Sequence, residues 1–176
     1  MLDRWGENAA QRAQLTVARQ EIEYLRRLYG AATDALGRWE DEASLAYGQS
    51  VYRRIFTASA EIRVAGSSVA LTGKGPDAWV AVVKNALKDY ETTQHLIGSQ
   101  LVTFSKVTFA GDEIVAGQAQ LTSYLHAWHA WPDRALRLVL GTYTDEVVYS
   151  PDVGWQIFDM TLAHTSSEAR IMGDPA

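Results

Sequence analysis

The second half of the chain consists of long β-rich runs that are separated by short turn signals. The runs are rich in Val, Ile, Thr, Tyr, Phe and Trp, residue types that favour strands, and they cover residues 95–109, 113–131, 135–149 and 155–167. Segments that are typical of turns connect them, namely Ala110-Gly111-Asp112, Pro132-Asp133 and residues 150–154. Four such runs in succession predict an antiparallel meander.

Helical segments come before this meander. From Thr16 onward, apolar residues recur at three- and four-residue steps and mark one face of a helix that should end near Gly37. Residues 40–56 begin with acids and close with Arg53 and Arg54, the charge order that suits a helix dipole. A short strand over 60–66, a turn or short hairpin over 67–75 and a third helix starting at Pro76 complete the first half. We expect residues 1–14 to be loosely ordered.

Helices followed by a meander predict one α+β domain over residues 1–176. Its N-terminal helices should cover one face of a strongly curved, mixed, mainly antiparallel sheet, giving a cone-shaped barrel. The chain has 176 residues and 47% hydrophobic content, which is enough for a sizeable core. The cavity between the helices and the sheet is the expected ligand site, and six Trp and eight Tyr suggest that it is lined by aromatic rings.

Composition argues against several classes of function. The formal net charge is −5 and the 16 basic residues are scattered, which argues against a nucleic-acid partner. The absence of cysteine removes disulfides, thiolate nucleophiles and cysteine-ligated metals, and fits a reducing compartment. We find neither an apolar signal core nor a membrane-spanning run, so we expect a cytoplasmic protein without a membrane partner.

The motifs of metal and nucleotide sites are also missing. His126 and His129 form an H-x-x-H pair, but residues three apart in a strand point to opposite faces and cannot share an ion. The segment "TGKGPD" lacks the phosphate-loop pattern, and no dinucleotide fingerprint is present. We therefore expect no metal and no cofactor.

Strand periodicity predicts that polar side chains of two neighbouring strands line one wall of the cavity. Alternation places Thr93, His95, Ile97 and Ser99 on one face of their strand, and Gln120, Thr122, Tyr124, His126 and Trp128 on one face of the next. A face of this composition suits a cavity with placed polar groups, and a solvated convex face is the alternative, since the opposite face is more apolar. Tyr143 is ambiguous by pattern alone.

His95 lies at the start of its strand, where it could be either a hydrogen-bonded structural residue or a general base aimed into the cavity. A base needs a carboxylate that orients its ring and stabilises the imidazolium. Asp34, near the end of the first helix, is a candidate. Helical periodicity, however, places Asp34 off the apolar stripe, with Glu23 and Arg27, and on its own predicts a solvated side chain.

The run "TTQHLIGSQLVTFSKVTFAGDEIVAGQAQL", together with "GTYTDEVVYSPDVGWQIF", resembles the SnoaL-like, or nuclear transport factor 2-like, superfamily. The resemblance extends from Ile22 to about His164 and is closest to the branch of scytalone dehydratase, hexachlorocyclohexane dehydrochlorinase and bile acid 7α-dehydratase. It implies a catalytic pair of Asp34 and His95. It also implies pocket positions, which fall on Tyr29, Ile62, Val64, Tyr90, Thr93, Thr122, Tyr124 and Tyr143.

Two departures from that branch concern the substrate. Thr33 and Val64 stand where scytalone dehydratase has the tyrosines that activate its substrate's carbonyl, which argues against scytalone. Tyr124 falls where that enzyme has a second histidine, and His126 lies two residues further along the same face.

The resemblance implies a cofactor-independent lyase that acts on a hydrophobic, aromatic small molecule. The reaction could be a dehydratase-like elimination or a formaldehyde-releasing cleavage of lignin-derived diarylpropanes, with Tyr124, His126 or Tyr143 as proton donor. A ketosteroid isomerase-like isomerase or polyketide cyclase, and a non-catalytic small-ligand binder, are the alternatives. We also expect a homo-oligomer, a dimer or trimer, because Val115, Leu121 and Leu125 would otherwise face water on a sheet face without helices.

Overall fold

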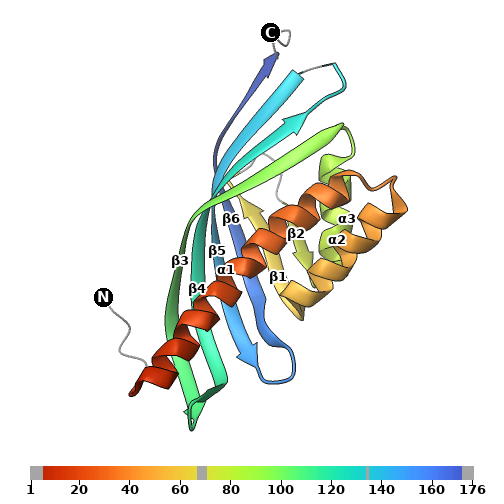
Figure 1. Ribbon diagram of the computed structural model, residues 1–176. Coiled ribbons are helices and arrows are strands. Elements are labelled where there is room, and N and C mark those ends of the chain that lie inside the picture. Colours follow the sequence, from red (N-terminus) through yellow and green to blue (C-terminus); the bar gives the residue numbers. More distant parts are fainter. Residues whose placement is uncertain (1–5, 67–70, 134, 172–176) are drawn as a thin grey trace.

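The computed structural model describes residues 6–66, 71–133 and 135–171. Over these residues three helices come with six strands in the order predicted from the sequence (Figure 1). The helices are α1 (Ala9–Gly37), α2 (Glu42–Ile55) and α3 (Pro76–Leu87). The strands are β1 (Phe56–Ala65), β2 (Leu71–Lys74), β3 (Thr92–Ala110), β4 (Glu113–Ala130), β5 (Ala135–Ser150) and β6 (Gly154–Ile171). No described helix combines the length and apolar character that crossing a bilayer requires.

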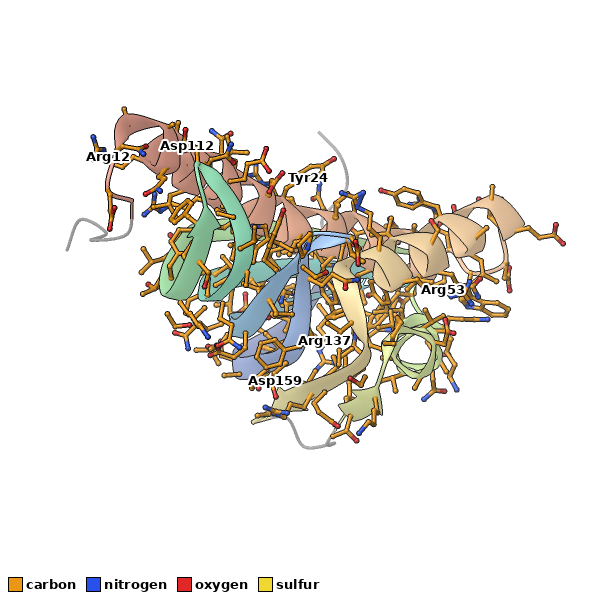
Figure 2. All side chains as sticks on the ribbon, turned by 90° about the horizontal axis from the view of Figure 1, so that it is seen from below. Arg12, Tyr24, Arg53, Asp112, Arg137 and Asp159 are labelled. Carbon is orange, nitrogen blue, oxygen red and sulfur yellow. The ribbon has the colours of Figure 1, made fainter. Side chains whose placement is uncertain are left out.

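The sheet is mixed and open, with the strand order β2-β1-β6-β5-β4-β3. Every neighbouring pair is antiparallel except β1 and β6, which run parallel. The three helices cover one face of this curved sheet, and the view from below shows the sheet bending around them (Figure 2). The predicted α+β architecture is confirmed, with the cone left open at the β2 and β3 edges.

Helix α1 begins earlier than its apolar periodicity predicts. The Asn8 side chain accepts a hydrogen bond from the Gln11 backbone N–H at 2.9 Å and so caps the helix. The same two side chains donate to the turn between β3 and β4, Asn8 to Asp112 at 3.0 Å and Gln11 to the Gly111 carbonyl at 2.9 Å. Residues 9–14 are therefore helical rather than loosely ordered, while residues 1–5 lie outside the described residues.

Helix α3 begins at a glycine that no other residue could replace without strain. Gly75 has a φ of 77°, in the left-handed region, and its N–H donates to the Ala60 carbonyl at 2.8 Å. A Cβ at this position would lie 2.6 Å from the Ala58 carbonyl oxygen. Pro76 then occupies the first turn, where its missing N–H costs nothing. This sharp entry places α3 beside β1 and β2, over the cavity described below.

A β-bulge changes which side chains of β3 face the helices. Three residues of β3 span the interval between Gly98 and Leu101, where β4 advances by only two, and Ser99 adopts a φ of 46°. Before the bulge Thr93, His95 and Ile97 face inward; after it Val102 and Phe104 do so. The predicted alternation is therefore correct as far as Ile97, and Ser99 is exposed.

A buried ion pair joins α1 to the middle of the sheet. Arg26 of α1 and Asp145 of β5 both have fully buried side chains, and the guanidinium donates two hydrogen bonds to the carboxylate, one of them from Nε at 3.1 Å. The Arg26 guanidinium also stacks over the Tyr143 ring at 3.8 Å and the Tyr29 ring at 4.5 Å. Burial is the largest single influence and lowers the pKa of Arg26. The charge and hydrogen bond of Asp145, with the neighbouring Tyr143 and Tyr29, together outweigh it and leave that pKa raised, so the cation persists.

Removing one partner of this pair should destabilise the protein strongly. Arg26→Met leaves the Asp145 carboxylate buried without its cation, and we expect the free energy of unfolding to fall by about 3–5 kcal/mol. The measurement is chemical denaturation followed by circular dichroism. The matched control is Glu61→Gln, which breaks the exposed Lys74–Glu61 pair and should cost less than about 1 kcal/mol. Equal losses in the two variants would contradict a structural role for the buried pair.

Candidate active site

The last turns of α1 pass close to the first residues of β3. Gly30 lies so near His95 that a Cβ there would be 3.4 Å from the His95 carbonyl oxygen, and Gly37 approaches Thr93 in the same way. Between these two glycines, Asp34 projects from α1 toward the strand. Its Oδ1 lies 2.7 Å from His95 Nδ1, which confirms that the two predicted residues meet.

Three donors converge on the Asp34 carboxylate. Besides the His95 ring, Thr93 Oγ1 donates to Oδ1 at 2.9 Å and the His95 backbone N–H donates to Oδ2 at 3.1 Å. An ionised carboxylate accepts only, so this arrangement places the proton of neutral His95 on Nδ1. The imidazole Nε2 then carries the lone pair. Only 7% of the His95 side chain and 21% of the Asp34 side chain remain exposed.

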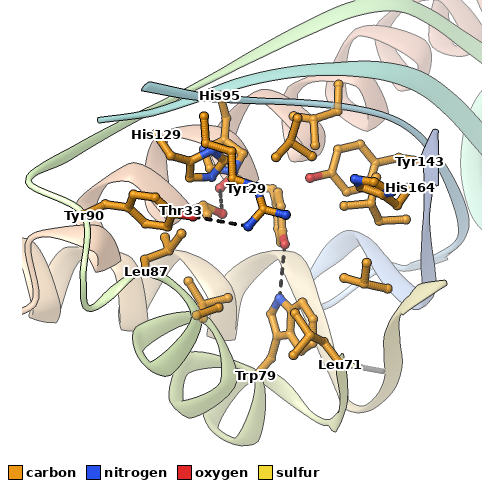
Figure 3. Close-up of a pocket in the computed structure, with 17 residues that line it drawn as sticks. Tyr29, Thr33, Leu71, Trp79, Leu87, Tyr90, His95, His129, Tyr143 and His164 are labelled. Atoms are coloured by element: carbon orange, nitrogen blue, oxygen red, sulfur yellow. Dashed lines mark hydrogen bonds between the residues drawn. The ribbon is translucent and has the colours of Figure 1, made fainter. Parts of the chain in front are cut away.

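His95 lines a cavity between the helices and the sheet, with a volume of about 270 Å³. Both layers of the fold contribute to it: α1 and α3 from the helices, and strands from both edges of the sheet (Figure 3). Its walls are mainly apolar, built from Val64, Leu71, Trp79, Val83, Ala86, Leu87, Leu125, Val139 and Leu162. The Trp79 indole N–H donates to the Tyr29 hydroxyl at 3.2 Å, which fixes two of the aromatic rings.

Polar groups gather at two separate places in this cavity (Figure 3). His95, His129 and Tyr90 lie together, with ring centroids 5.6 Å apart for the two histidines and 4.9 Å apart for His129 and Tyr90. Tyr143 and His164 lie on the other side. A ligand in this cavity would therefore meet polar groups at two places and mainly apolar walls elsewhere.

His129 is a neutral histidine at physiological pH. Burial lowers its pKa from the ordinary value of 6.5 to about 4, and the neighbouring His95 adds to this effect. A hydrogen bond with the Arg137 backbone and the Asp34 charge act in the opposite direction and are weaker. The buried Nδ1 has no hydrogen-bond partner in the part of the chain that the structure describes.

Tyr143 is held in its protonated form. Burial, followed by the neighbouring Tyr29, raises the pKa of its phenol well above 10. Tyr143 can therefore donate a hydrogen bond into the cavity, but it cannot act as a phenolate base.

The predicted pocket residues separate into three groups. Tyr29, Val64, Tyr90 and Tyr143 line the cavity, as predicted. Thr93 does not line it; its hydroxyl instead holds Asp34 in place.

The third group does not reach the cavity at all. Ile62 is buried in the hydrophobic core with 1% of its surface exposed and does not line the cavity, contrary to the prediction. Thr122, Tyr124 and His126 point away from the helices, and Tyr124 is 60% exposed, so their assignment to the cavity is also wrong. The physical reason is that helices cover the more apolar face of β4, which carries Leu121 and Leu125, and the polar face remains outside.

The sequence-based prediction missed three polar residues of the cavity, His129, Arg137 and His164. His129 could have been found, because it continues the apolar face of β4 and the H-x-x-H spacing already separated it from His126. Arg137 and His164 gave no such signal, since each stands in a strand where either face was open. Among the described residues no cluster of three or more metal-ligating side chains occurs.

Comparison with known proteins identifies the family. The SnoaL-like domain family matches residues 14–161, which is most of the chain. The protein belongs to the SnoaL-like family. Among curated proteins no significant match is found.

Solved structures share the fold at low sequence identity. A putative scytalone dehydratase from Novosphingobium aromaticivorans superposes with a TM-score of 0.65 at 17% identity, covering 94% of this chain and 94% of its own. Hexachlorocyclohexane dehydrochlorinase LinA-type3 from Novosphingobium barchaimii gives 0.66 at 15% identity, covering 94% and 99%. The beta subunit of a putative aromatic-ring-hydroxylating dioxygenase from N. aromaticivorans gives 0.58 at 17%, covering 86% and 92%. These similarities establish the fold of this SnoaL-like protein.

The depressed pKa of His129 predicts a specific acid sensitivity. Between pH 6.5 and about pH 4 the unfolded chain binds a proton at this residue that the folded chain does not, so the free energy of unfolding should fall as pH falls. One such proton corresponds to a slope of at most about 1.4 kcal/mol per pH unit. His129→Leu should remove this part of the slope, as measured by urea denaturation across the range. His126→Gln on the outer face is the control, and an unchanged slope in His129→Leu would contradict the assignment.

Proposed function

We propose that this protein is a cofactor-independent lyase in which His95 is the general base and Asp34 its orienting carboxylate. The observation that carries the proposal is the 2.7 Å contact between Asp34 Oδ1 and His95 Nδ1 at the wall of an apolar cavity. Such a contact leaves Nε2 with a lone pair and places a negative charge where the imidazolium will need it. The dehydratase and dehydrochlorinase among the similar structures support this class of reaction.

The proposed reaction is an elimination. His95 Nε2 takes a proton from the substrate, and the electron pair left behind forms a double bond as a leaving group departs with its own pair from the neighbouring atom. In the formaldehyde-releasing variant, His95 removes the proton of a hydroxyl, and the electron pair left on that oxygen forms the carbonyl of formaldehyde as the carbon–carbon bond breaks. The pair of the broken bond then forms a double bond as the leaving group departs with its own pair from the neighbouring carbon. Asp34 stabilises the imidazolium in both cases, and the proton returns to the leaving group or to solvent.

The cavity suits a small, largely hydrophobic and aromatic substrate. Its apolar walls and the rings of Tyr29 and Trp79 supply burial and ring contacts, while few polar groups fix the orientation. Of the three proton donors predicted from the sequence, only Tyr143 reaches the cavity. Its raised pKa makes it a hydrogen-bond donor to a carbonyl or leaving group at the end away from His95.

The same geometry also supports an isomerase or cyclase of the ketosteroid isomerase or polyketide cyclase type. In that case His95 would return the abstracted proton to another atom and no group would leave. A non-catalytic binder is the other alternative, and the similarity to a dioxygenase beta subunit favours keeping it. Mass spectrometry of ligands that co-purify with the protein, followed by product analysis, separates the three: a lyase gives two products, an isomerase one, and a binder none.

Substitution of the dyad should abolish turnover without unfolding the protein. His95→Gln removes the base, and we expect kcat to fall by about 10²–10⁴-fold. Asp34→Asn keeps the shape but removes the charge, so it should lower kcat strongly with a smaller effect on KM, because the imidazolium forms only in the transition state. The measurements are steady-state kinetics beside thermal melts.

His126→Gln is the matched control for these variants, since it changes a histidine of β4 that faces away from the cavity. It should retain turnover. Near-normal kcat in a folded His95→Gln protein would rule out the mechanism and leave His95 as a structural residue.

We also propose that the protein self-associates through the uncovered face of the sheet. Leu96, Leu101 and Tyr124 lie on this face across β3 and β4 and are 60%, 63% and 60% exposed. Of the residues that the sequence placed there, Leu121 and Leu125 are buried under the helices and Val115 is half-buried, so the argument for an oligomer rests on other residues than predicted. A second copy of the chain would remove this apolar surface from water.

Light scattering at micromolar concentration should give the mass of a dimer or trimer. Leu101→Glu places a charge in the exposed patch and should shift the protein toward the monomer. Tyr24→Glu, at a 52% exposed position on α1, should leave the mass unchanged. A monomeric mass for the unmodified protein would refute self-association.

A further inference from the structure

Arg137 is the one permanently charged side chain among the residues that the structure places along the cavity wall. Among the described residues no aspartate or glutamate lines the cavity with it, and Asp34 lies behind His95. Within the described part of the chain Arg137 forms no ion pair. Its side chain makes one hydrogen bond, from Nη1 to the Tyr90 hydroxyl at 3.3 Å. Most of the N–H donors of this partly buried guanidinium are therefore unused, and an anion would satisfy them.

Neighbouring groups define where such an anion would sit. Tyr90 accepts from Arg137 through its oxygen, so its own phenolic proton remains available to a second acceptor. Arg137 is also the cross-strand partner of His129, whose ring lies 5.6 Å from the His95 ring. The guanidinium therefore belongs to the polar cluster around His95 and not to the distant group formed by Tyr143 and His164.

We propose that Arg137, assisted by the Tyr90 hydroxyl, binds a carboxylate of the substrate next to the catalytic base. The planar guanidinium donates two parallel N–H bonds to a carboxylate, and a neutral group accepts such bonds less strongly. His129 cannot compete as a cation at neutral pH, because it stays uncharged there. The substrate class is then an aromatic acid whose ring lies in the apolar part of the cavity. This inference rests on the proposed function for the identity of the site as a substrate pocket.

The test measures binding and therefore does not depend on turnover. The probes are 2-naphthoate and its methyl ester, which share a ring system and differ in charge. Isothermal titration calorimetry at pH 8, where an ordinary histidine is neutral, gives Kd for each. We expect the unmodified protein to bind the acid at least about tenfold more tightly than the ester, as a charge-assisted hydrogen bond provides.

Variants assign this preference to a residue. Arg137→Met should abolish the preference by weakening the binding of the acid alone. Arg137→Lys should keep part of the preference, since the charge remains but the two parallel N–H donors are lost. Arg53→Met removes an arginine that is 59% exposed and outside the cavity, and should change nothing. His95→Gln should keep the preference, which separates this inference from the proposed catalysis.

The inference is overturned if the acid does not bind more tightly than the ester, including by not binding at all. Retention of the preference in Arg137→Met would also overturn it, as would its loss in His95→Gln, because the imidazole would then be the anion's partner. If the acid binds through Arg137 but no substrate is turned over, the carboxylate site stands and the proposed lyase activity is wrong. If only neutral substrates are turned over, the lyase activity stands and the carboxylate site is wrong.

Discussion

The buried pair of Arg26 and Asp145 is the contact on which the rest of the architecture depends. Two charges without exposure to water are tolerated only because each satisfies the other, so the pair fixes how α1 lies across β5. The guanidinium also stacks on Tyr143 and Tyr29, and thereby sets the inner wall of the cavity. Any shift of α1 would break a desolvated ion pair and an aromatic cluster together, which gives the helix one stable position.

The dyad uses the same helix, eight residues further along. Asp34 follows Arg26 by slightly more than two turns, so both side chains leave α1 toward the sheet, one to β5 and the other to β3. A helix held in place by its middle can then present a carboxylate to His95 without a mobile loop. In the proposed mechanism this rigidity matters, because a general base must stay within hydrogen-bond reach of its orienting group and its substrate.

The chemistry of the cavity lies in the contrast between its polar groups. One histidine, His95, is hydrogen-bonded to a carboxylate, while its neighbour His129 is kept neutral by burial. Arg137 contributes a charge that has no counterion among the described residues at the same place, and Tyr143 a protonated phenol at the other. A SnoaL-like scaffold can carry many reactions, so these side chains, and not the fold, define the expected substrate.

The element order, the α+β class and the candidate pair of Asp34 and His95 could be predicted from the sequence, because periodicity and turn residues reflect local backbone preferences and the family resemblance supplies the pair. Tertiary structure decided which face of β4 meets the helices, and thus excluded Thr122, Tyr124 and His126 and admitted His129. It also decided that Asp34 is paired, although helical periodicity predicts a solvated side chain. Periodicity states which residues share a face, but only the packing of α1 on β3 and the bulge at Ser99 select the face that encloses the cavity.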